Sequence, residues 1–251
     1  MLKRTAVIFS GAGLSADSGI PTFRDSDGLW HSHKVEDVAS QDGWQRDKET
    51  VLKFYEERFK GIKEAQPNEA HVSIARLQEK FEVVNITQNI DDLLERAGCK
   101  YVNHLHGVIT RRKCEWHKDI SNLDGDTNFT CEYKSDQNEP VKLGEQCPKC
   151  SKKNVQAQLR PDVVWFGEAV DFKYDYGHAL IKEVKYNNGV FICVGTSAQV
   201  YPAAYLLSWF SQVKHKYIVD KKPNKISDYT LCEGSAYKEL PKLVDKLLID
   251  S

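Results

Sequence analysis

Two short polar stretches of this sequence carry side chains that could bind a cofactor and move a proton. Thr87–Asp91 (TQNID) follows an apolar run that begins at Val83, and His104–Gly107 (HLHG) comes soon after it. Because α/β folds bind ligands at the carboxyl ends of their strands, the polar groups of TQNID are well placed for ligand contacts. A histidine in such a loop, here His106, is a candidate general base. Taken alone, Asn89 or Asp91 could simply cap a helix, and a lone histidine is more often a structural or surface residue than a base.

A glycine-rich turn near the N-terminus predicts a phosphate-binding loop. Gly11-Ala12-Gly13-Leu14-Ser15-Ala16 follows the apolar run at 6–9 and fits the dinucleotide pattern G-x-G-x-x-G/A. The glycines let the backbone approach a pyrophosphate, and the start of the next helix offers N–H groups. A plain turn between a strand and a helix explains the same residues without a ligand.

The residues after this turn differ from those of a dehydrogenase. A second strand that ends in an acidic residue should follow about 20 residues on. Here Gly19 and Pro21 end any helix, and Phe23-Arg24 follows. We interpret the stretch as a long loop that covers a nucleotide, with Phe23 shielding a reactive carbon from water and Arg24 facing phosphates.

Clustered cysteines predict a metal site. The chain has seven cysteines, and the odd count argues against a disulfide framework in a cytosolic protein. The spacing favours a Cys₃His zinc site built from Cys114, His117, Cys147 and Cys150. Cys131 could replace His117 and give a four-cysteine site, and a module without metal is the third reading.

A tyrosine and an arginine form a second candidate site. Tyr55 and Arg58 are three residues apart in a helical stretch and therefore share a face. Arginine offers a carboxylate two donors in a fork, and tyrosine adds a hydroxyl. On an amphipathic helix the same pair is usually a surface feature.

The elements that must position these residues alternate between strand and helix. Short apolar runs at 6–9, 83–87, 163–166, 190–195 and 217–220 predict buried parallel strands, and 68–80 and 240–249 predict helices, the latter with Pro241 in its first turn. The pattern indicates an α/β fold: a Rossmann-like doubly wound parallel sheet with two interruptions. The expected division is a nucleotide-binding domain at 1–30, 71–110 and 159–251, a helical insertion at 31–70, and a small zinc-binding module at 111–158.

The composition excludes several classes of protein. The 251 residues are 41% hydrophobic and 28% charged with a net charge of −1, which gives no reason to expect nucleic acid as a partner. No apolar stretch of about 18 residues could span a membrane, and the N-terminal apolar run is too short for a signal peptide. We therefore expect a cytoplasmic protein, and a monomer by default.

Taken together, the motifs resemble those of the sirtuin family of NAD-dependent protein-lysine deacylases. The matching segments are GAGLSADSGIPTFR, TQNID, HG, the cysteine cluster, RPDVVWFGE and GTSAQVYPAA, in the family's order over residues 10–204. The resemblance implies that NAD is cleaved at its nicotinamide–ribose bond and that the acyl group moves from lysine to the ribose. It implies a structural zinc ion, a catalytic role for Asn89, and His106 as the base.

The resemblance also assigns binding residues. Those implied for NAD are Gly11, Ala12, Gly13, Ser15, Phe23, Arg24, Trp30, Gln88, Asn89, Ile90, Asp91, Gly195, Thr196, Ser197, Asp220 and Ala236. Within this set, Gln88, Asn89 and Asp91 match positions that hold the nicotinamide and its ribose. Asp220 stands where many members have Asn. Val164, Phe166 and Gly167 fall in a segment expected to pair with an extended, acylated peptide.

The pair Tyr55 and Arg58 resembles the Tyr-x-x-Arg pair of class III sirtuins, which recognise succinyl- and malonyl-lysine. We therefore expect desuccinylase as well as deacetylase activity on acylated-lysine proteins. Two alternatives remain open. One is an NAD glycohydrolase or ADP-ribosyltransferase on the same scaffold, and the other is a non-catalytic NAD-binding or zinc-ribbon interaction module.

Overall fold

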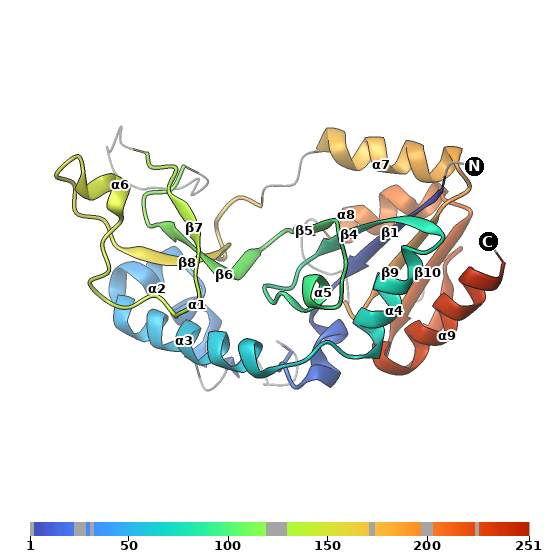
Figure 1. Cartoon of the computed structure of the whole chain (residues 1–251), viewed down its shortest axis with the longest axis horizontal. Coiled ribbons are helices and arrows are strands. Elements are labelled where there is room, and N and C mark those ends of the chain that lie inside the picture. The colour runs from blue at the N-terminus through green and yellow to red at the C-terminus, as the bar shows by residue number, and fades with distance from the viewer. Residues whose placement is uncertain are drawn as a thin grey trace.

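The computed structural model describes residues 3–22, 29–30, 33–118, 130–170, 174–196, 203–223 and 226–250. Two lobes lie side by side, as Figure 1 shows. The larger lobe holds the N-terminal strand and the C-terminal helix, and the smaller lobe holds the cysteine cluster. No described helix has the length and apolar character to cross a membrane.

A six-stranded parallel sheet forms the larger lobe. Its strands, in spatial order, are β11 (Thr230–Glu233), β10 (His215–Asp220), β9 (Val190–Val194), β1 (Arg4–Ser10), β4 (Phe81–Thr87) and β5 (Val102–His104). β4 and β5 lie on one side of β1, and β9, β10 and β11 lie on its other side. The direction in which successive strands are added to the sheet therefore reverses at β1. Ligands bind at the carboxyl ends of strands at such a reversal. The predicted Rossmann-like fold is confirmed.

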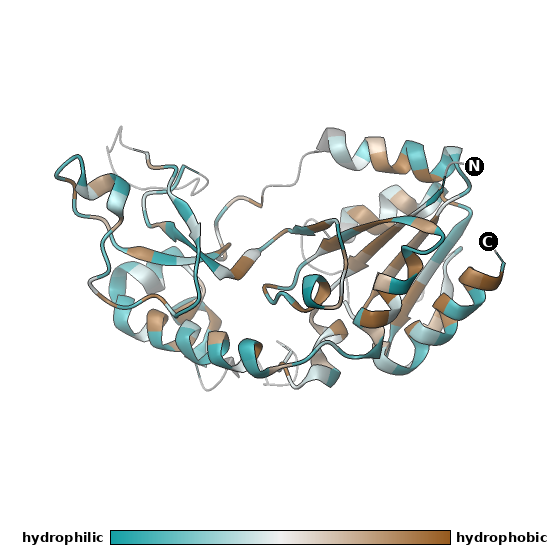
Figure 2. Cartoon of the chain, viewed as in Figure 1, coloured by the Kyte–Doolittle hydropathy of each residue, from teal (hydrophilic) through white to brown (hydrophobic). Residues whose placement is uncertain are grey.

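Helices cover both faces of this sheet because the side chains of β1 alternate. Ala6 and Ile8 pack in one core with α4 (Glu69–Leu77) and α9 (Ala236–Ile249). Val7 and Phe9 pack in another core with α7 (Tyr174–Tyr186) and α8 (Ala203–Trp209), which the short helix η3 (Phe210–Gln212) follows. The apolar strands lie between the two helical layers in Figure 2.

The smaller lobe combines an antiparallel sheet with the helical insertion. β7 (Lys134–Asp136), β6 (Gly107–Cys114) and β8 (Leu159–Val163) form the sheet, and α6 (Pro148–Ser151) carries Cys150 and has Cys147 as its N-cap. The hairpin β2 (Leu29–Trp30) and β3 (His33–Lys34) precedes α1 (Val35–Val38), α2 (Gln41–Arg46) and α3 (Lys48–Glu64). Apolar residues of α3, β6 and β8 share one core. The strands of this lobe extend past the expected limits of the module at 111 and 158.

Two predictions about elements were wrong. Residues 163–166 are not a strand of the parallel sheet: β8 pairs antiparallel with β6 and ends at Val163. Beyond β8, Val164 N–H donates to the His106 carbonyl and Phe166 N–H donates to the Ala39 carbonyl. Residues 164–166 therefore do not pair with any described strand of the parallel sheet. The C-terminal helix begins at Ala236 rather than at 240, so Pro241 lies inside it. The backbone N–H groups of residues 238 and 239 both donate to the Ser235 carbonyl and so start the helix earlier.

Candidate active site

The glycine-rich turn packs against the loop that follows β9. Gly13 N–H donates to the Gly195 carbonyl at 2.8 Å, and a Cβ added to Gly13 would lie 2.7 Å from Gly195 Cα. Gly195 itself has a φ of +63°, and a Cβ there would lie 2.4 Å from Leu14 N. The close approach of two backbones therefore explains these glycines. It brings the residues expected to contact phosphates, including Ala12 and Thr196, to one edge of the sheet.

The expected helix after the turn is replaced by two short 3₁₀ turns. These are η1 (Ala12–Leu14) and η2 (Ala16–Ser18), and Gly19 ends the second with a φ of +86°. Such short turns carry no appreciable helix dipole. The expectation that a helix N-terminus at this turn helps to bind phosphate is therefore wrong. Phe23, Arg24 and Ser197 lie outside the described residues, as does the side chain of Trp30, which ends β2.

Ser15 is the centre of a buried hydrogen-bond network with the TQNID loop. Its hydroxyl donates to Asp91 Oδ2 at 2.9 Å and accepts from Asn89 Nδ2 at 3.1 Å. All three residues are buried. Burial raises the pKa of Asp91, while the bonds from Leu93 N–H and Ser15 lower it. The structure thus joins two predicted motifs that are 76 residues apart.

His71 completes this network, and the sequence analysis missed it. Asn68 N–H donates to His71 Nδ1 at 3.2 Å, so the proton of the neutral ring is on Nε2, which lies 3.3 Å from Ser15 Oγ. Burial lowers the pKa of His71 to about 4, so the ring is neutral at physiological pH. It therefore donates to Ser15 and fixes the direction of the Ser15 hydroxyl. The available signal was the capping-box spacing of Asn68 and His71 at the start of α4.

His106 is held in the tautomer that a general base needs. Its Nδ1 lies 3.0 Å from the Gln88 carbonyl and donates to it, which leaves the lone pair on Nε2. Burial lowers the pKa of His106 and the Gln88 carbonyl partly offsets this, so the ring is neutral near pH 7. Gly107 has a φ of +74°, and a Cβ there would lie 2.0 Å from the Asp162 carbonyl oxygen. The glycine lets β6 pass close to β8 immediately after the histidine.

Two further contacts orient the TQNID loop. Thr196 Oγ1 donates to Gln88 Oε1 at 2.8 Å, which joins this loop to the loop after β9. His104 Nδ1 lies 2.8 Å from the Asn89 carbonyl, and its Nε2 lies 2.8 Å from Glu95 Oε1. Burial works to lower the pKa of His104, but Glu95 and the Asn89 carbonyl outweigh it, so the pKa is raised.

A cavity of about 610 Å³ opens between the two lobes, and His106 itself is not among the described residues that line it. Its walls include Leu105 and Gly107, the two neighbours of His106, together with Val164 and Ala169. Charged residues of both signs line its outer part, among them Asp92, Glu95, Arg111 and Asp136. The predicted peptide segment therefore borders open space at Val164, and Phe166, in the same segment, is 58% exposed.

Tyr55 and Arg58 lie on the buried face of α3, where their side chains are 2% and 8% exposed. The interpretation as a surface pair is therefore wrong. Burial lowers the pKa of Arg58 to about 10, against the opposing effects of Tyr55 and Asp91. Burial also raises the pKa of Tyr55 to about 12, so the hydroxyl keeps its proton. The negative charge of Asp91 works to raise the pKa of Arg58. Arg58 on α3 therefore lies within electrostatic range of the TQNID loop.

The remaining predicted positions lie at the carboxyl end of the sheet. Asp220 ends β10, and its carboxylate accepts from Lys222 N–H at 2.8 Å. Ala236 is the buried first residue of α9, just beyond Gly234, whose N–H donates to the Asp220 carbonyl. Ile90 is 9% exposed, and its carbonyl accepts from Ile109 N–H in β6.

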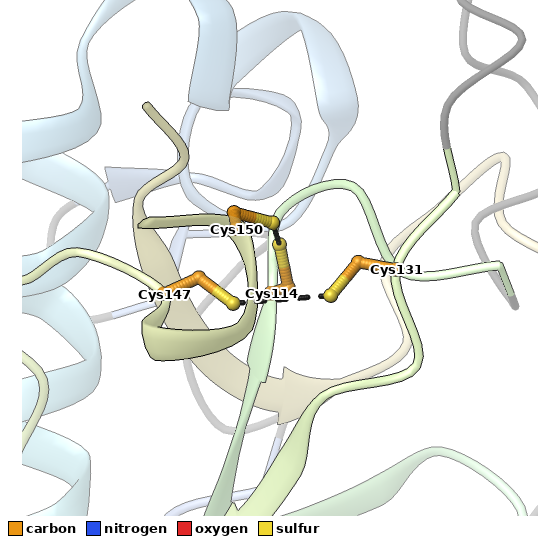
Figure 3. A group of neighbouring side chains, drawn as sticks. All are labelled: Cys114, Cys131, Cys147 and Cys150. Carbon is orange, nitrogen blue, oxygen red and sulfur yellow. Dashed lines mark hydrogen bonds between the residues drawn. The ribbon is translucent and has the colours of Figure 1, made fainter. Parts of the chain in front are cut away.

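The metal site is a four-cysteine cluster. Cys114, Cys131, Cys147 and Cys150 are all buried, and their Sγ atoms lie within 4.8 Å of one another (Figure 3). The pairs Cys114–Cys150 and Cys131–Cys147 are 3.6 and 3.8 Å apart. A tetrahedral zinc ion with Zn–S bonds of about 2.3 Å would place its sulfur atoms about 3.8 Å apart. The donor set therefore fits zinc in a closed structural site.

The preference for His117 as fourth ligand was wrong. Residues 117 and 131 form a parallel backbone bridge, and Cys131 N–H donates to the Trp116 carbonyl. This pairing brings the Cys131 sulfur into the cluster, and His117 is not part of it. The knuckle at Cys114 is instead completed by Trp116 N–H, which donates to Cys114 Sγ at 3.4 Å.

Comparisons with known proteins agree with this geometry. Two proteins named NAD-dependent protein deacylase are each 40% identical to the chain. The alignment with the one from Pyrococcus furiosus covers 96% of this chain and 92% of that protein. The one from Helicobacter pylori aligns over 219 residues, or 87% and 85%.

Solved structures give the same result. The chain superposes with a TM-score of 0.81 on a variant Sir2 homologue in complex with ADP-ribose, at 33% identity over 99% of this chain and 93% of that one. A Sir2 homologue in complex with NAD gives a TM-score of 0.78 at 34% identity, over 99% and 91%. The model of the Sir2 family matches residues 11–202. The chain therefore belongs to the Sir2 family, the sirtuins.

Proposed function

We propose that this protein is an NAD-dependent protein-lysine deacylase that removes acetyl groups and also succinyl or malonyl groups from lysine. Acyl-lysine, NAD and one water molecule, which enters after nicotinamide has left, would give free lysine, nicotinamide and O-acyl-ADP-ribose. One observation carries the proposal: His106 is a neutral base oriented by the Gln88 carbonyl of the TQNID loop, and this loop binds Ser15 of the glycine-rich turn through Asn89 and Asp91. The names of the relatives support the deacylase activity, and the choice of acyl group is our own inference.

NAD supplies the ribose carbon that the acyl oxygen attacks, with nicotinamide as the leaving group. In this proposal Asn89 and Asp91, with Gln88 and Ile90, hold the nicotinamide and its ribose at the end of β4. His106 Nε2 accepts a proton from a ribose hydroxyl, so that the acyl group transfers to the sugar. Because an amide oxygen is a weak nucleophile, the protein must hold it close to the ribose and exclude water.

The other predicted contacts follow the two loops that pack together. Gly11, Ala12, Gly13 and Ser15 would face the phosphates with Gly195 and Thr196, while Asp220 and Ala236 lie towards the adenosine ribose. The assignments to Phe23, Arg24 and Ser197, which lie outside the described residues, and to the side chain of Trp30 rest on the resemblance alone. We further propose that 1–30, 71–110 and 159–251 bind NAD, that 31–70 forms the acyl pocket, and that 111–158 is the zinc module.

The acyl pocket is proposed from the burial of Tyr55 and Arg58. A guanidinium in a site of low dielectric costs solvation energy, and a substrate carboxylate would offset that cost. Acetyl-lysine lacks this carboxylate and would use the same channel without the contact. The cavity borders Val164, and the peptide would pair with the backbone of 164–167 as an added strand. The protein partners would thus be acylated-lysine proteins. We also propose a cytoplasmic location and a monomeric state.

The test compares one peptide carrying either acetyl- or succinyl-lysine, with NAD present. Peptide-dependent release of nicotinamide, matched by O-acyl-ADP-ribose, would support the deacylase. ADP-ribose formed without peptide would instead establish a glycohydrolase. No turnover in either case would leave a non-catalytic NAD-binding module.

A further inference from the structure

We propose that Trp165 is a positioning residue that sets the preference between acyl groups, acting through the Tyr55 hydroxyl. The inference rests on the proposed deacylase function and on the proposed carboxylate pocket. It concerns a residue whose side chain touches neither the reacting atoms nor, in this proposal, the substrate, although its backbone lies in the segment proposed to pair with the peptide. The two side chains meet although they are 110 positions apart in the sequence.

The contact between them determines where the Tyr55 proton points. Trp165 Nε1 donates a hydrogen bond to Tyr55 Oη at 3.0 Å, and both residues are 2% exposed. Indole nitrogen is a donor only, so the hydroxyl must be the acceptor in this bond. Among the described residues, no hydrogen bond donated by the Tyr55 hydroxyl is found. Its proton is therefore directed away from Trp165 and is available to an acceptor in the acyl pocket.

The bond also strengthens the hydroxyl as a donor. A hydroxyl that accepts a hydrogen bond is polarised and donates a stronger one, especially where the local dielectric is low. Burial keeps the phenol protonated, since it raises the pKa of Tyr55 to about 12. A succinyl or malonyl carboxylate would thus meet two donors, the Arg58 guanidinium and the directed Tyr55 hydroxyl.

Trp165 is held in place by buried charges rather than by apolar packing alone. Arg160 is fully buried and its Cζ lies 3.6 Å from the centre of the Trp165 ring. Glu168 binds Arg160 Nη2 through both carboxylate oxygens, at 2.6 and 2.8 Å, and accepts from Trp165 N–H at 3.1 Å. Glu168 therefore fixes the backbone of Trp165 and also the cation stacked on its ring.

A purely stabilising role would not require this arrangement. Buried ion pairs contribute little net stability compared with apolar residues of the same volume, because desolvation offsets the attraction. What the pair provides here is a fixed plane and direction for the indole N–H. Trp44 serves as an internal contrast: its ring lies 5.4 Å from that of Trp165, and its N–H donates to Glu115 at 3.0 Å. Its N–H does not touch the Tyr55 hydroxyl.

The test measures kcat/KM for acetyl- and succinyl-lysine forms of one peptide in the full-length enzyme. Trp165→Phe keeps the ring that stacks on Arg160 but removes the N–H. We expect the succinyl value to fall about tenfold, mainly through KM, which corresponds to about 1.4 kcal/mol. The acetyl value should change by less than about twofold, because an acetyl group offers the directed hydroxyl no carboxylate. Trp44→Phe, the matched control, should leave the ratio of the two values unchanged.

Tyr55→Phe and the double variant W165F/Y55F complete a cycle. If Trp165 acts through the hydroxyl, the double variant should lose no more succinyl activity than Tyr55→Phe alone. Additive losses would overturn the proposal, and so would equal losses for the two peptides or a normal succinyl value in Trp165→Phe. In those cases a wild-type enzyme that removes succinyl groups would leave the proposed function intact. Absence of succinyl turnover in the wild type would overturn the carboxylate pocket and this inference together.

Discussion

At the carboxyl end of the parallel sheet, buried polar groups are joined mainly by neutral hydrogen bonds. Ser15 donates to the carboxylate of Asp91, and Asn89 and a neutral His71 bind the Ser15 hydroxyl. Around Trp165, by contrast, the buried groups are fully charged: Arg160 pairs with Glu168 at 2.6 Å, and Lys113 lies 3.6 Å from Asp162. Neither Arg160 nor Lys113 is more than 2% exposed.

The difference follows from what each region must do in the proposed reaction. The sheet end must exchange a proton and release nicotinamide, so its groups need a neutral base and a hydroxyl of fixed direction. The region around Trp165 must keep the same geometry whichever acyl group is bound. Opposite charges in a low dielectric hold each other strongly, although their net contribution to stability is small. In this proposal the sheet end therefore takes part in proton transfer, whereas the region around Trp165 fixes the positions of side chains.

The largest expected effect comes from removing the base. His106→Ala should lower kcat/KM for both peptides by about 1,000-fold, within the range for loss of general base catalysis, while the fold is retained. His178→Ala, on the exposed side of α7, is the matched control. An activity within about tenfold of the wild type would show that another group takes the proton.

The pH dependence of the same residue sharpens this prediction. A base works only when unprotonated, so activity should be lost as the pH falls through the pKa of His106. Burial places that pKa below its ordinary value of 6.5. The acid limb of the kcat/KM profile should therefore have its midpoint below pH 6.5, and a midpoint above pH 7 would contradict the assignment.

Arg58 tests the acyl pocket. Arg58→Met should lower succinyl kcat/KM by about 100-fold, since a charge-assisted hydrogen bond contributes about 1.5–3 kcal/mol. The acetyl value should stay within about threefold. Lys60→Met removes a cation from the exposed face of the same helix and should affect neither peptide. Equal losses for both acyl groups in Arg58→Met would count against a carboxylate role.

The cysteine cluster predicts that Cys131 is needed for zinc binding and that His117, its partner in a backbone bridge, is not. Cys131→Ser should abolish stoichiometric zinc binding and lower the free energy of unfolding by several kcal/mol, because metal binding and folding of such modules are coupled. His117→Ala should retain one zinc per chain, measured by metal analysis after dialysis. The reverse result would restore the Cys₃His site.

The smallest effect should come from the pair His104 and Glu95. The pKa of His104 is raised in the folded state, so the pair stabilises the protein fully below the unfolded pKa of about 6.5 and loses this effect as the pH rises through the folded pKa. Glu95→Gln should therefore lower Tm more at pH 5.5 than at pH 9. Solvent screens the half-exposed Glu95, which limits the loss to about 1 kcal/mol or less. A loss independent of pH would exclude the ion pair as its cause.

Local patterns in the sequence were sufficient for β1, β4, β9 and β10 of the parallel sheet, for the glycine-rich turn and for the order of the motifs, but not for the short edge strands β5 and β11. β1 contains the continuous apolar run 6–9, and the stripe of Ala70, Ile74 and Leu77 marks α4, because period and burial are local properties of the chain. The family resemblance rests on motifs of this kind, each contained within a few consecutive residues.

Contacts between distant segments were decided only by the tertiary structure. The spacing of Cys114 and His117 suggested a ligand pair, but a backbone bridge to Cys131 chose the fourth sulfur. The run at 163–166 has strand composition, yet hydrogen bonds to the carbonyls of His106 and Ala39 take it out of the sheet.

The same applies to the side chains that orient the site. His71 reaches Ser15 across 56 positions, and Trp165 reaches Tyr55 across 110. The sequence alone determined which residues could do the chemistry, since composition and short-range spacing set their types and elements. Their direction, protonation and partners depend on packing between segments that are remote in the chain, and only the folded structure settles these.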